Sequence, residues 1–192
     1  MGKVFVNITM SLDGFVARPD VDADRPFGDD GERIHDWMFS TPTETERHIA
    51  GEMFAETGAF VLGRRMFDLG EAPWGDDGTF GRPCFVLTNR PRATLTKGPT
   101  TFTFVTDGIH HCLDLARHAA GGKHVCIAGG ATVIQHYLRA KLVDELWLHV
   151  SPVLFGAGTR LFEHIGGDIV ELTKLSVRDT PSATHFVFRV ER

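Results

Sequence analysis

The stretch "KHVCIAGGATVIQHYL", residues 123–138, changes its hydrophobic period in the middle. The run at 125–128 is short and continuously apolar, as a fully buried strand is. After the adjacent residues Gly129 and Gly130, the apolar residues recur at helical spacing, at Val133, Ile134, Tyr137 and Leu138. A buried strand therefore passes through two glycines into a helix, and such a turn allows a ligand to approach the backbone closely.

The composition is that of an ordinary globular protein of one domain, residues 1–192, with 42% hydrophobic and 23% charged residues. The chain does not open like a signal peptide, and it has no apolar run of about 18 residues, so we expect a cytoplasmic protein outside membranes. A formal net charge of -5 argues against a nucleic-acid partner. The three cysteines lack metal-ligand spacing, so we expect reduced thiols and no metal site.

Predicted strands and helices alternate along the chain. Apolar patterning predicts strands at 3–12, 59–62, 84–88, 101–106, 125–128, 142–150, 169–178 and 184–190. It predicts further helices at 41–57, where Thr41 is the expected N-cap, Pro42 the first helical residue and Glu44 the end of a capping box, and at 110–120. We therefore expect an α/β protein whose largely parallel sheet is covered on both faces, with the last two strands as an antiparallel edge hairpin.

Glycines and charged residues gather where four of these strands end. The segments are Asp13-Gly14, Gly63-Arg64-Arg65, Thr88-Asn89-Arg90 and Gly129-Gly130-Ala131-Thr132. Open α/β sheets bind ligands at this edge, and helix N-termini and arginine side chains both suit phosphate. A glycine pair alone is as often only a tight turn, and two adjacent arginines alone are more often a solvated pair. Their coincidence predicts a phosphorylated nucleotide, although neither G-x-G-x-x-G nor a Walker A lysine is present.

Four segments match a known family in order and spacing: "VLGRRMFD" (61–68), "FVLTNRP" (85–91), "IAGGATVIQHYL" (127–138) and "LVDELWLHVSPVLFGAGTRLF" (142–162). The chain resembles the dihydrofolate-reductase-like superfamily, and "SLDG" (11–14) makes it most similar to the branch named for the reductase half of riboflavin biosynthesis. The resemblance implies a three-layer α/β/α fold, a mixed and mostly parallel sheet of about eight strands, bound NADPH and a homodimer.

The resemblance also implies a set of cofactor-binding positions. They are Gly63, Arg64 and Arg65 for the 2′-phosphate, Thr88, Asn89 and Arg90 for the adenosine side, and Gly129, Gly130, Ala131, Thr132 and Val133 for the pyrophosphate. Two positions depart from the family pattern. Met66 replaces a threonine that bonds the 2′-phosphate, which leaves the choice between NADPH and NADH open, and Phe15 stands where riboflavin reductases carry lysine.

Hydride transfer to a C=N or C=O group needs residues that orient the acceptor and supply a proton. The candidates are Asp13, near the nicotinamide position of the family, and His149, on a strand that lines the substrate pocket in dihydrofolate reductases. Asp36 and Trp37, which follow the long loop 17–31, are candidates for contacting a flat heterocycle. The alternative roles are a turn former for Asp13, a hydrogen-bonded buried histidine for His149, and helix initiation and packing for Asp36 and Trp37.

These observations favour an NADPH-dependent reductase that acts on a small flat heterocycle such as a pteridine, a pyrimidine or a flavin-like compound. Two alternatives to a reductase remain. The first is a dinucleotide-binding protein without efficient chemistry, and the second is a homodimeric interaction module in which the cofactor cleft is vestigial.

Overall fold

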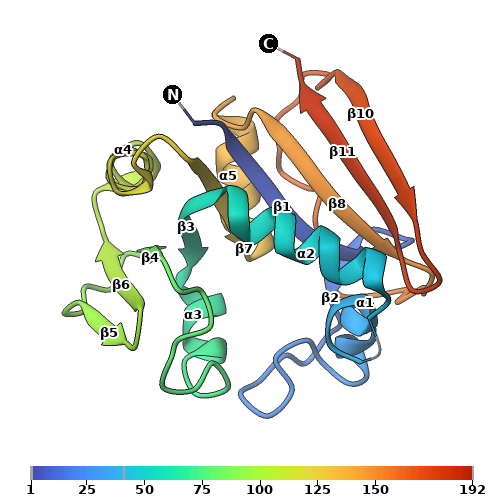
Figure 1. Ribbon diagram of the computed structural model, residues 1–192, viewed down its shortest axis with the longest axis horizontal. Coiled ribbons are helices and arrows are strands. Elements are labelled where there is room, and N and C mark those ends of the chain that lie inside the picture. Colours follow the sequence, from blue (N-terminus) through green and yellow to red (C-terminus); the bar gives the residue numbers. More distant parts are fainter. Residues whose placement is uncertain (1, 41, 192) are drawn as a thin grey trace.

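The computed structural model describes residues 2–40 and 42–191 (Figure 1). Within them, nine strands form one sheet. In spatial order these are β10 (Leu172–Asp179), β11 (Thr184–Val190), β8 (Glu145–Ser151), β1 (Val4–Ser11), β7 (His124–Gly129), β3 (Thr57–Gly63), β4 (Pro83–Leu87), β6 (Thr100–Val105) and β5 (Leu95–Lys97).

The sheet is mostly parallel, as predicted. Every neighbouring pair from β8 to β6 is parallel, whereas β11 pairs antiparallel with both β8 and β10. The predicted edge hairpin at the C-terminal end is therefore confirmed. Three short strands were not predicted: β5, which adds to the other edge, and β2 (Phe15–Ala17) and β9 (Thr159–Arg160), which form a second, two-stranded sheet. Strands of two or three residues are too short to show a hydrophobic period.

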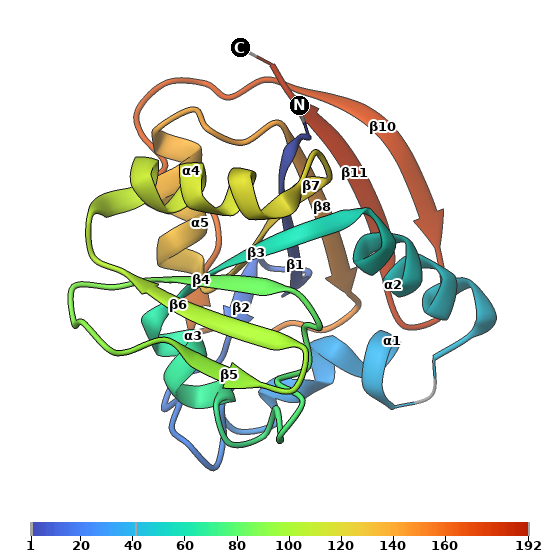
Figure 2. The same cartoon turned by 60° about the vertical axis from the view of Figure 1, so that its left-hand side comes forward.

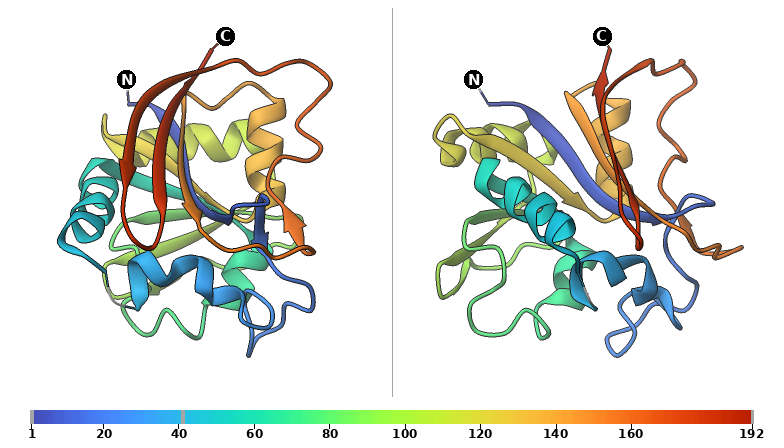
Figure 3. Two further views of the ribbon diagram at one scale, coloured as in Figure 1. Left: turned by 90° about the vertical axis from the view of Figure 1, so that its right-hand side faces the viewer. Right: turned by 45° about the vertical axis from the view of Figure 1, so that its right-hand side comes forward.

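Helices cover both faces of the sheet. On one face lie α4 (Gly108–Ala120) and α5 (Ala131–Arg139), and on the other lie α2 (Glu44–Glu56) and α3 (Arg64–Gly70). Figure 3 shows α2 and α5 on opposite sides of the sheet, and Figure 2 shows α4 and α5 together. Strand β1 serves both layers, because Val4 and Val6 pack into the first cluster and Phe5 into the second. The three-layer prediction is confirmed.

The predicted start of α2 was wrong. Thr41 lies outside the described residues, Pro42 precedes the helix, and Glu44 is its first residue. The capping box joins Thr43 and Glu46 instead: the Glu46 N–H donates to the Thr43 hydroxyl (3.2 Å), and the Thr43 N–H donates to the Glu46 carboxylate (2.7 Å). The sequence offers Thr-x-x-Glu in both registers. The second one buries the Glu46 carboxylate against the Thr180 hydroxyl (2.7 Å), a contact that the local pattern does not show.

Between β2 and α2 the chain forms a long loop at 18–30, then a 3-10 helix η1 (Gly31–His35) and the short helix α1 (Asp36–Phe39). The loop was predicted, but the two helical turns after it were not. In the part of the chain that the structure describes, no helix is long and apolar enough to cross a membrane.

Candidate active site

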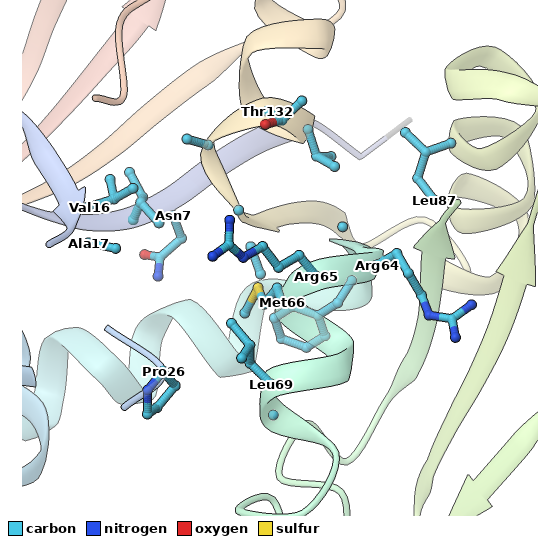
Figure 4. A pocket seen from close by; sticks show the side chains of 18 of the residues that line it. Asn7, Val16, Ala17, Pro26, Arg64, Arg65, Met66, Leu69, Leu87 and Thr132 are labelled. Atoms are coloured by element: carbon cyan, nitrogen blue, oxygen red, sulfur yellow. The ribbon is translucent and has the colours of Figure 1, made fainter. Parts of the chain in front are cut away.

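A cavity of about 980 Å³ opens at the edge of the sheet where the parallel strands end (Figure 4). Its walls come from the ends of β3, β4 and β7, from the beginnings of α3 and α5, and from the loop at 18–30. Open α/β sheets bind ligands at this edge, and the volume is at the upper end of the range for small-molecule sites. The cavity is therefore the candidate active site.

All but one of the predicted cofactor residues line this cavity. They are Gly63, Arg64, Arg65, Thr88, Asn89, Arg90, Gly130, Ala131, Thr132 and Val133. The exception, Gly129, is the last residue of β7, and its φ of 123° is a conformation that glycine adopts readily. The fold thus brings three segments that are distant in the sequence to one wall.

The second glycine of the turn, Gly130, faces open space in the cavity. Gly130 has a φ of -68°, which any residue adopts. A Cβ built on Gly130 would meet no protein atom within 4 Å. Because Gly130 lines the cavity, a side chain there would take up space that a ligand would otherwise occupy. This empty space fits the phosphates of a dinucleotide.

The first turn of α5 provides N–H groups beside this space. The Gly130 carbonyl accepts from the N–H groups of Val133 (3.1 Å) and Ile134 (3.3 Å). The N–H groups of Ala131 and Thr132 come earlier in the helix, where no carbonyl of the same helix is available to accept them. Both residues line the cavity, so this helix end suits an anion.

Arginines form the corner of the cavity beside α3. The Asp68 carboxylate accepts from Arg64 Nε (2.7 Å) and from Arg90 Nη2 (2.7 Å), and Arg64 Nη1 donates to the Arg90 carbonyl (2.9 Å). Burial acts to raise the pKa of Asp68, but the bonds from the two guanidinium groups outweigh it and lower the pKa. One carboxylate thus holds two guanidinium groups together, and the corner keeps a net positive charge.

Arg64 and Arg65 extend in different directions from the beginning of α3 (Figure 4). Arg65 Nη2 donates to the Val21 carbonyl (3.3 Å), so this side chain connects α3 with the loop at 18–30. Met66, at the position where the family carries threonine, also lines the cavity.

Neither Asp36 nor Trp37 lines the large cavity. Asp36 borders a separate cavity of about 240 Å³, and Trp37 is buried, with its Nε1 donating to the Thr9 hydroxyl (3.1 Å). The neighbouring residues His35, Met38 and Phe39 line the large cavity instead. They are spaced as i, i+3 and i+4, which places them on one side of a helical turn. The segment predicted to contact the heterocycle thus borders the cavity, but through residues other than the two that were named.

His35 is a site residue that the sequence reasoning missed. Its ring lies against the Phe27 ring (4.5 Å between centroids), and its Nδ1 atom is buried without a hydrogen-bond partner among the described residues. Burial lowers the pKa of His35 to about 4, so the imidazole is neutral near pH 7. The available signal was a histidine at the end of the short helical turn that follows a long loop.

Asp13 is not among the residues that line the cavity, and its carboxylate is held by neighbouring hydrogen-bond donors. Its carboxylate accepts hydrogen bonds from the Ser11 hydroxyl (2.6 Å) and from the N–H groups of Gly156 (2.7 Å) and Phe155 (3.1 Å). The bond from Ser11 is the largest of the effects that lower the pKa of Asp13 to about 2. The group is therefore ionised near pH 7, where it fixes the loop after β8 and has no proton to donate.

His149 also lies outside the cavity wall. It is 3% exposed, and its ring lies between the Trp37 ring (4.3 Å between centroids) and the His185 ring (5.0 Å). Its Nε2 atom is 3.0 Å from the amide of Asn7, which lines the cavity. His149 thus reaches the cavity only through Asn7. Among the described residues, no group of histidine, cysteine and acidic side chains is arranged to hold a metal ion.

The lowered pKa of His35 predicts a pH dependence of stability. An unfolded histidine takes up a proton near pH 6.5, whereas the folded one does so only near pH 4. The free energy of unfolding is therefore unaffected by this histidine above about pH 6.5. As the pH falls toward 4, the unfolded state takes up the proton first, and the free energy of unfolding decreases by up to about 3 kcal/mol. We expect His35→Gln to reduce the loss of unfolding free energy between these pH values, as measured by urea titration. An unchanged loss would mean that His35 is accessible to protons in the folded protein.

Comparisons with known proteins identify the family of the chain. Residues 2–186 match the family described as the RibD C-terminal domain. The uncharacterized protein YwjB of Bacillus subtilis (strain 168) is 23% identical over 183 residues, which cover 93% of this chain and 90% of YwjB.

Solved structures show the same fold. A protein from Shewanella sp. PV-4, provisionally assigned to riboflavin biosynthesis, is 23% identical with a TM-score of 0.73 and 99% coverage of both chains. A pyrimidine reductase-like protein from Corynebacterium diphtheriae is 14% identical with a TM-score of 0.65, covering all of this chain and 92% of its own. Because the family match extends over nearly the whole sequence, the chain belongs to the RibD C-terminal domain family, with its dihydrofolate-reductase-like fold.

Proposed function

We propose that the protein is an NADPH-dependent reductase that transfers a hydride to a small flat heterocycle of the pyrimidine, pteridine or flavin type. The observation that carries the proposal is the open space at Gly130, where a Cβ would meet no protein atom within 4 Å and which lies beside the first turn of α5. Membership in the RibD C-terminal domain family supports it, as does the fold shared with a pyrimidine reductase-like protein.

The residues that would hold NADPH follow from the cavity walls. The N–H groups of Ala131 and Thr132 suit the pyrophosphate, and the guanidinium groups of Arg64 and Arg90 suit the phosphate on the adenosine ribose. When bound, NADPH supplies the hydride. The protein then has to orient the acceptor and polarise its C=N or C=O group.

His35 is the residue that we propose for this task. Its buried Nδ1 has no partner among the described residues, and the ring borders the cavity beside the apolar side chains of Met38 and Phe39. A neutral imidazole can hydrogen-bond the C=N or C=O group of the acceptor from such a position. As the hydride adds to carbon, the ring N–H stabilises the negative charge that develops on the heteroatom, and solvent supplies the proton.

NADPH oxidation in the presence of a panel of pyrimidines, pteridines and flavins tests the proposal. We expect steady turnover with at least one class, and loss of turnover in His35→Gln with little change in NADPH affinity. Binding of NADPH without turnover of any acceptor would favour the dinucleotide-binding alternative. Absence of any dinucleotide binding would favour the interaction module.

We also propose a homodimer in which the edge strand β10 takes part. Apolar side chains on and beside this outer strand are exposed, namely Ile169 (90%), Leu172 (41%), Leu175 (46%) and Val177 (45%). An outer strand with exposed apolar residues is prone to pair with another chain. Light scattering should give twice the chain mass of 21.2 kDa, and Leu175→Glu should lower it. A monomeric wild-type protein, or an equal effect of Leu154→Glu on the loop after β8, would contradict this interface.

A cytoplasmic location belongs to the same proposal. Cys84, Cys112 and Cys126 are buried and unpaired. Free thiols are usual in the reducing compartment in which NADPH-dependent reductases work.

A further inference from the structure

A chain of hydrogen bonds leads from helix α2 to the cavity. The Glu46 carboxylate lies 2.7 Å from the Thr180 hydroxyl, which lies 3.2 Å from His185 Nε2. The Nδ1 atoms of His185 and His149 are 2.7 Å apart, and His149 Nε2 is 3.0 Å from the amide oxygen position of Asn7. Asn7 is the only member of this relay that lines the cavity.

The sheet keeps the relay in place and away from water. His149 on β8 pairs laterally with Thr9 on β1 and with His185 on β11. The Trp37 ring covers His149 (4.3 Å) and touches His185 (5.0 Å). Both histidines are 3% exposed and Glu46 is fully buried. With no solvent to exchange partners, each proton in the relay is placed by its neighbours.

Glu46 sets the direction of the first bonds. Burial acts to raise its pKa, but the bonds from the Thr43 N–H and the Thr180 hydroxyl outweigh burial and lower the pKa, so the group is ionised and only accepts. The single hydroxyl proton of Thr180 therefore goes to Glu46. The Ala183 carbonyl (2.8 Å) competes for that proton, but an ionised carboxylate is the stronger acceptor, and with either acceptor the hydroxyl has no proton left for His185. The Thr180 oxygen can then only accept from His185, which places a proton on His185 Nε2.

The same reasoning continues to the cavity. Burial is the largest effect that lowers the pKa of both His149 and His185, so each ring is neutral and carries one proton. With the His185 proton on Nε2, its Nδ1 accepts from His149 Nδ1, and His149 Nε2 is left with a lone pair. Asn7 must donate its amide N–H to that lone pair. The two ends of an amide have the same shape, and hydrogen-bond partners decide which end is which.

We propose that Glu46 is a positioning residue that, through this relay, turns the carbonyl oxygen of Asn7 toward the cavity, where it accepts a hydrogen bond from an N–H group of the bound heterocycle. The ligand class that fits is a cyclic amide with a ring N–H. The orientation of Asn7 is independent of the proposed reductase activity. Only the identity of the ligand rests on that proposed activity. The other charged or titratable groups that act on the two histidines are His35, Arg178 and Asp179.

Nitrogen-15 NMR of the histidine rings in the protein without ligand tests the relay directly. Protonated and unprotonated ring nitrogens have distinct chemical shifts, and the signals of each ring are assigned by their loss in His149→Gln and His185→Gln. We expect the proton on Nδ1 in His149 and on Nε2 in His185. We also expect a scalar coupling across the bond from the Asn7 amide nitrogen to His149 Nε2. The opposite tautomers, or no coupling to Asn7, would overturn the proposal.

Two variants at Thr180 test whether Glu46 is the origin of this order. Thr180→Val disconnects Glu46 from His185, and we expect a mixture of tautomers in both rings. Thr180→Ser keeps the hydroxyl and should keep the wild-type tautomers, which serves as the matched control. Wild-type tautomers in the valine variant would overturn the role of Glu46. The wild-type spectrum decides the orientation of Asn7 even if the valine variant does not fold.

Two small probes test the ligand class without any turnover. Uracil has ring N–H groups, whereas 1,3-dimethyluracil has the same ring and carbonyl groups without them. We expect uracil, and not the dimethyl compound, to shift the side-chain amide signal of Asn7. Equal shifts with both probes, or no shift with either, would overturn the assignment of the ligand class. That result would leave the dinucleotide site untouched, because NADPH binding is measured separately.

Discussion

The Gly130→Val variant is expected to lose dinucleotide binding while it keeps its fold. A valine side chain at this position meets no protein atom within 4 Å of its Cβ, and the backbone there is in a conformation that valine adopts. The side chain instead enters the cavity beside the first turn of α5. Because phosphate oxygens have to reach those N–H groups, we expect NADPH affinity to fall by about 100-fold or more, which corresponds to roughly 3 kcal/mol.

Calorimetric titration gives the affinity, and circular dichroism with thermal unfolding gives the integrity of the fold. Gly167→Val is the matched control, since Gly167 also has open space around it but does not line the cavity. Unchanged NADPH affinity in Gly130→Val would remove the phosphate site from this turn. A collapsed fold would contradict the open space around residue 130.

Arg64→Ala is expected to weaken NADPH binding more than NADH binding. Arg64 stands at the corner where two guanidinium groups share Asp68, and a hydrogen bond to a charged group contributes about 1.5–3 kcal/mol. We therefore expect a loss of roughly 10- to 100-fold for NADPH, and a much smaller loss for NADH, which has no 2′-phosphate.

The control is Arg92→Ala, which removes a nearby positive charge from a residue that pairs with Glu71 and does not line the cavity. Equal losses of NADPH and NADH in Arg64→Ala would show that this side chain does not touch the 2′-phosphate. Met66, which also lines the cavity, has no hydroxyl that could replace the lost hydrogen bond.

The cavity wall that we propose for the cofactor could be located from the sequence because its signals are local. Glycines and arginines at strand ends identify the binding edge, and a parallel sheet necessarily gathers those ends. The prediction therefore placed Gly130 and Arg64 on one wall although 66 positions separate them.

The substrate side depends on contacts between distant segments. The choice of His35 over Trp37 is set by how one short helical turn lies against β1 and β8, where the Trp37 indole bonds Thr9. Asp13 is held by N–H groups of Phe155 and Gly156, which no pattern around "SLDG" indicates.

The start of α2 shows the same limit on a smaller scale. Two registers of the capping box are equally good in the local sequence. The register that forms, with Thr43 and Glu46, also brings the Glu46 carboxylate to the Thr180 hydroxyl, on a turn far along the chain. Local patterning thus determined the elements and the edge of the sheet at which the cavity lies, whereas long-range hydrogen bonds determined which polar side chains face the cavity.

Parallel calorimetric titrations of the wild-type protein with NADPH and NADH test the central claim most directly. The account predicts micromolar or tighter binding of NADPH, with clearly weaker binding of NADH, because the arginine corner interacts with the 2′-phosphate. Absence of heat, and of a thermal shift, with both dinucleotides would contradict the cofactor site and with it the proposed reductase activity.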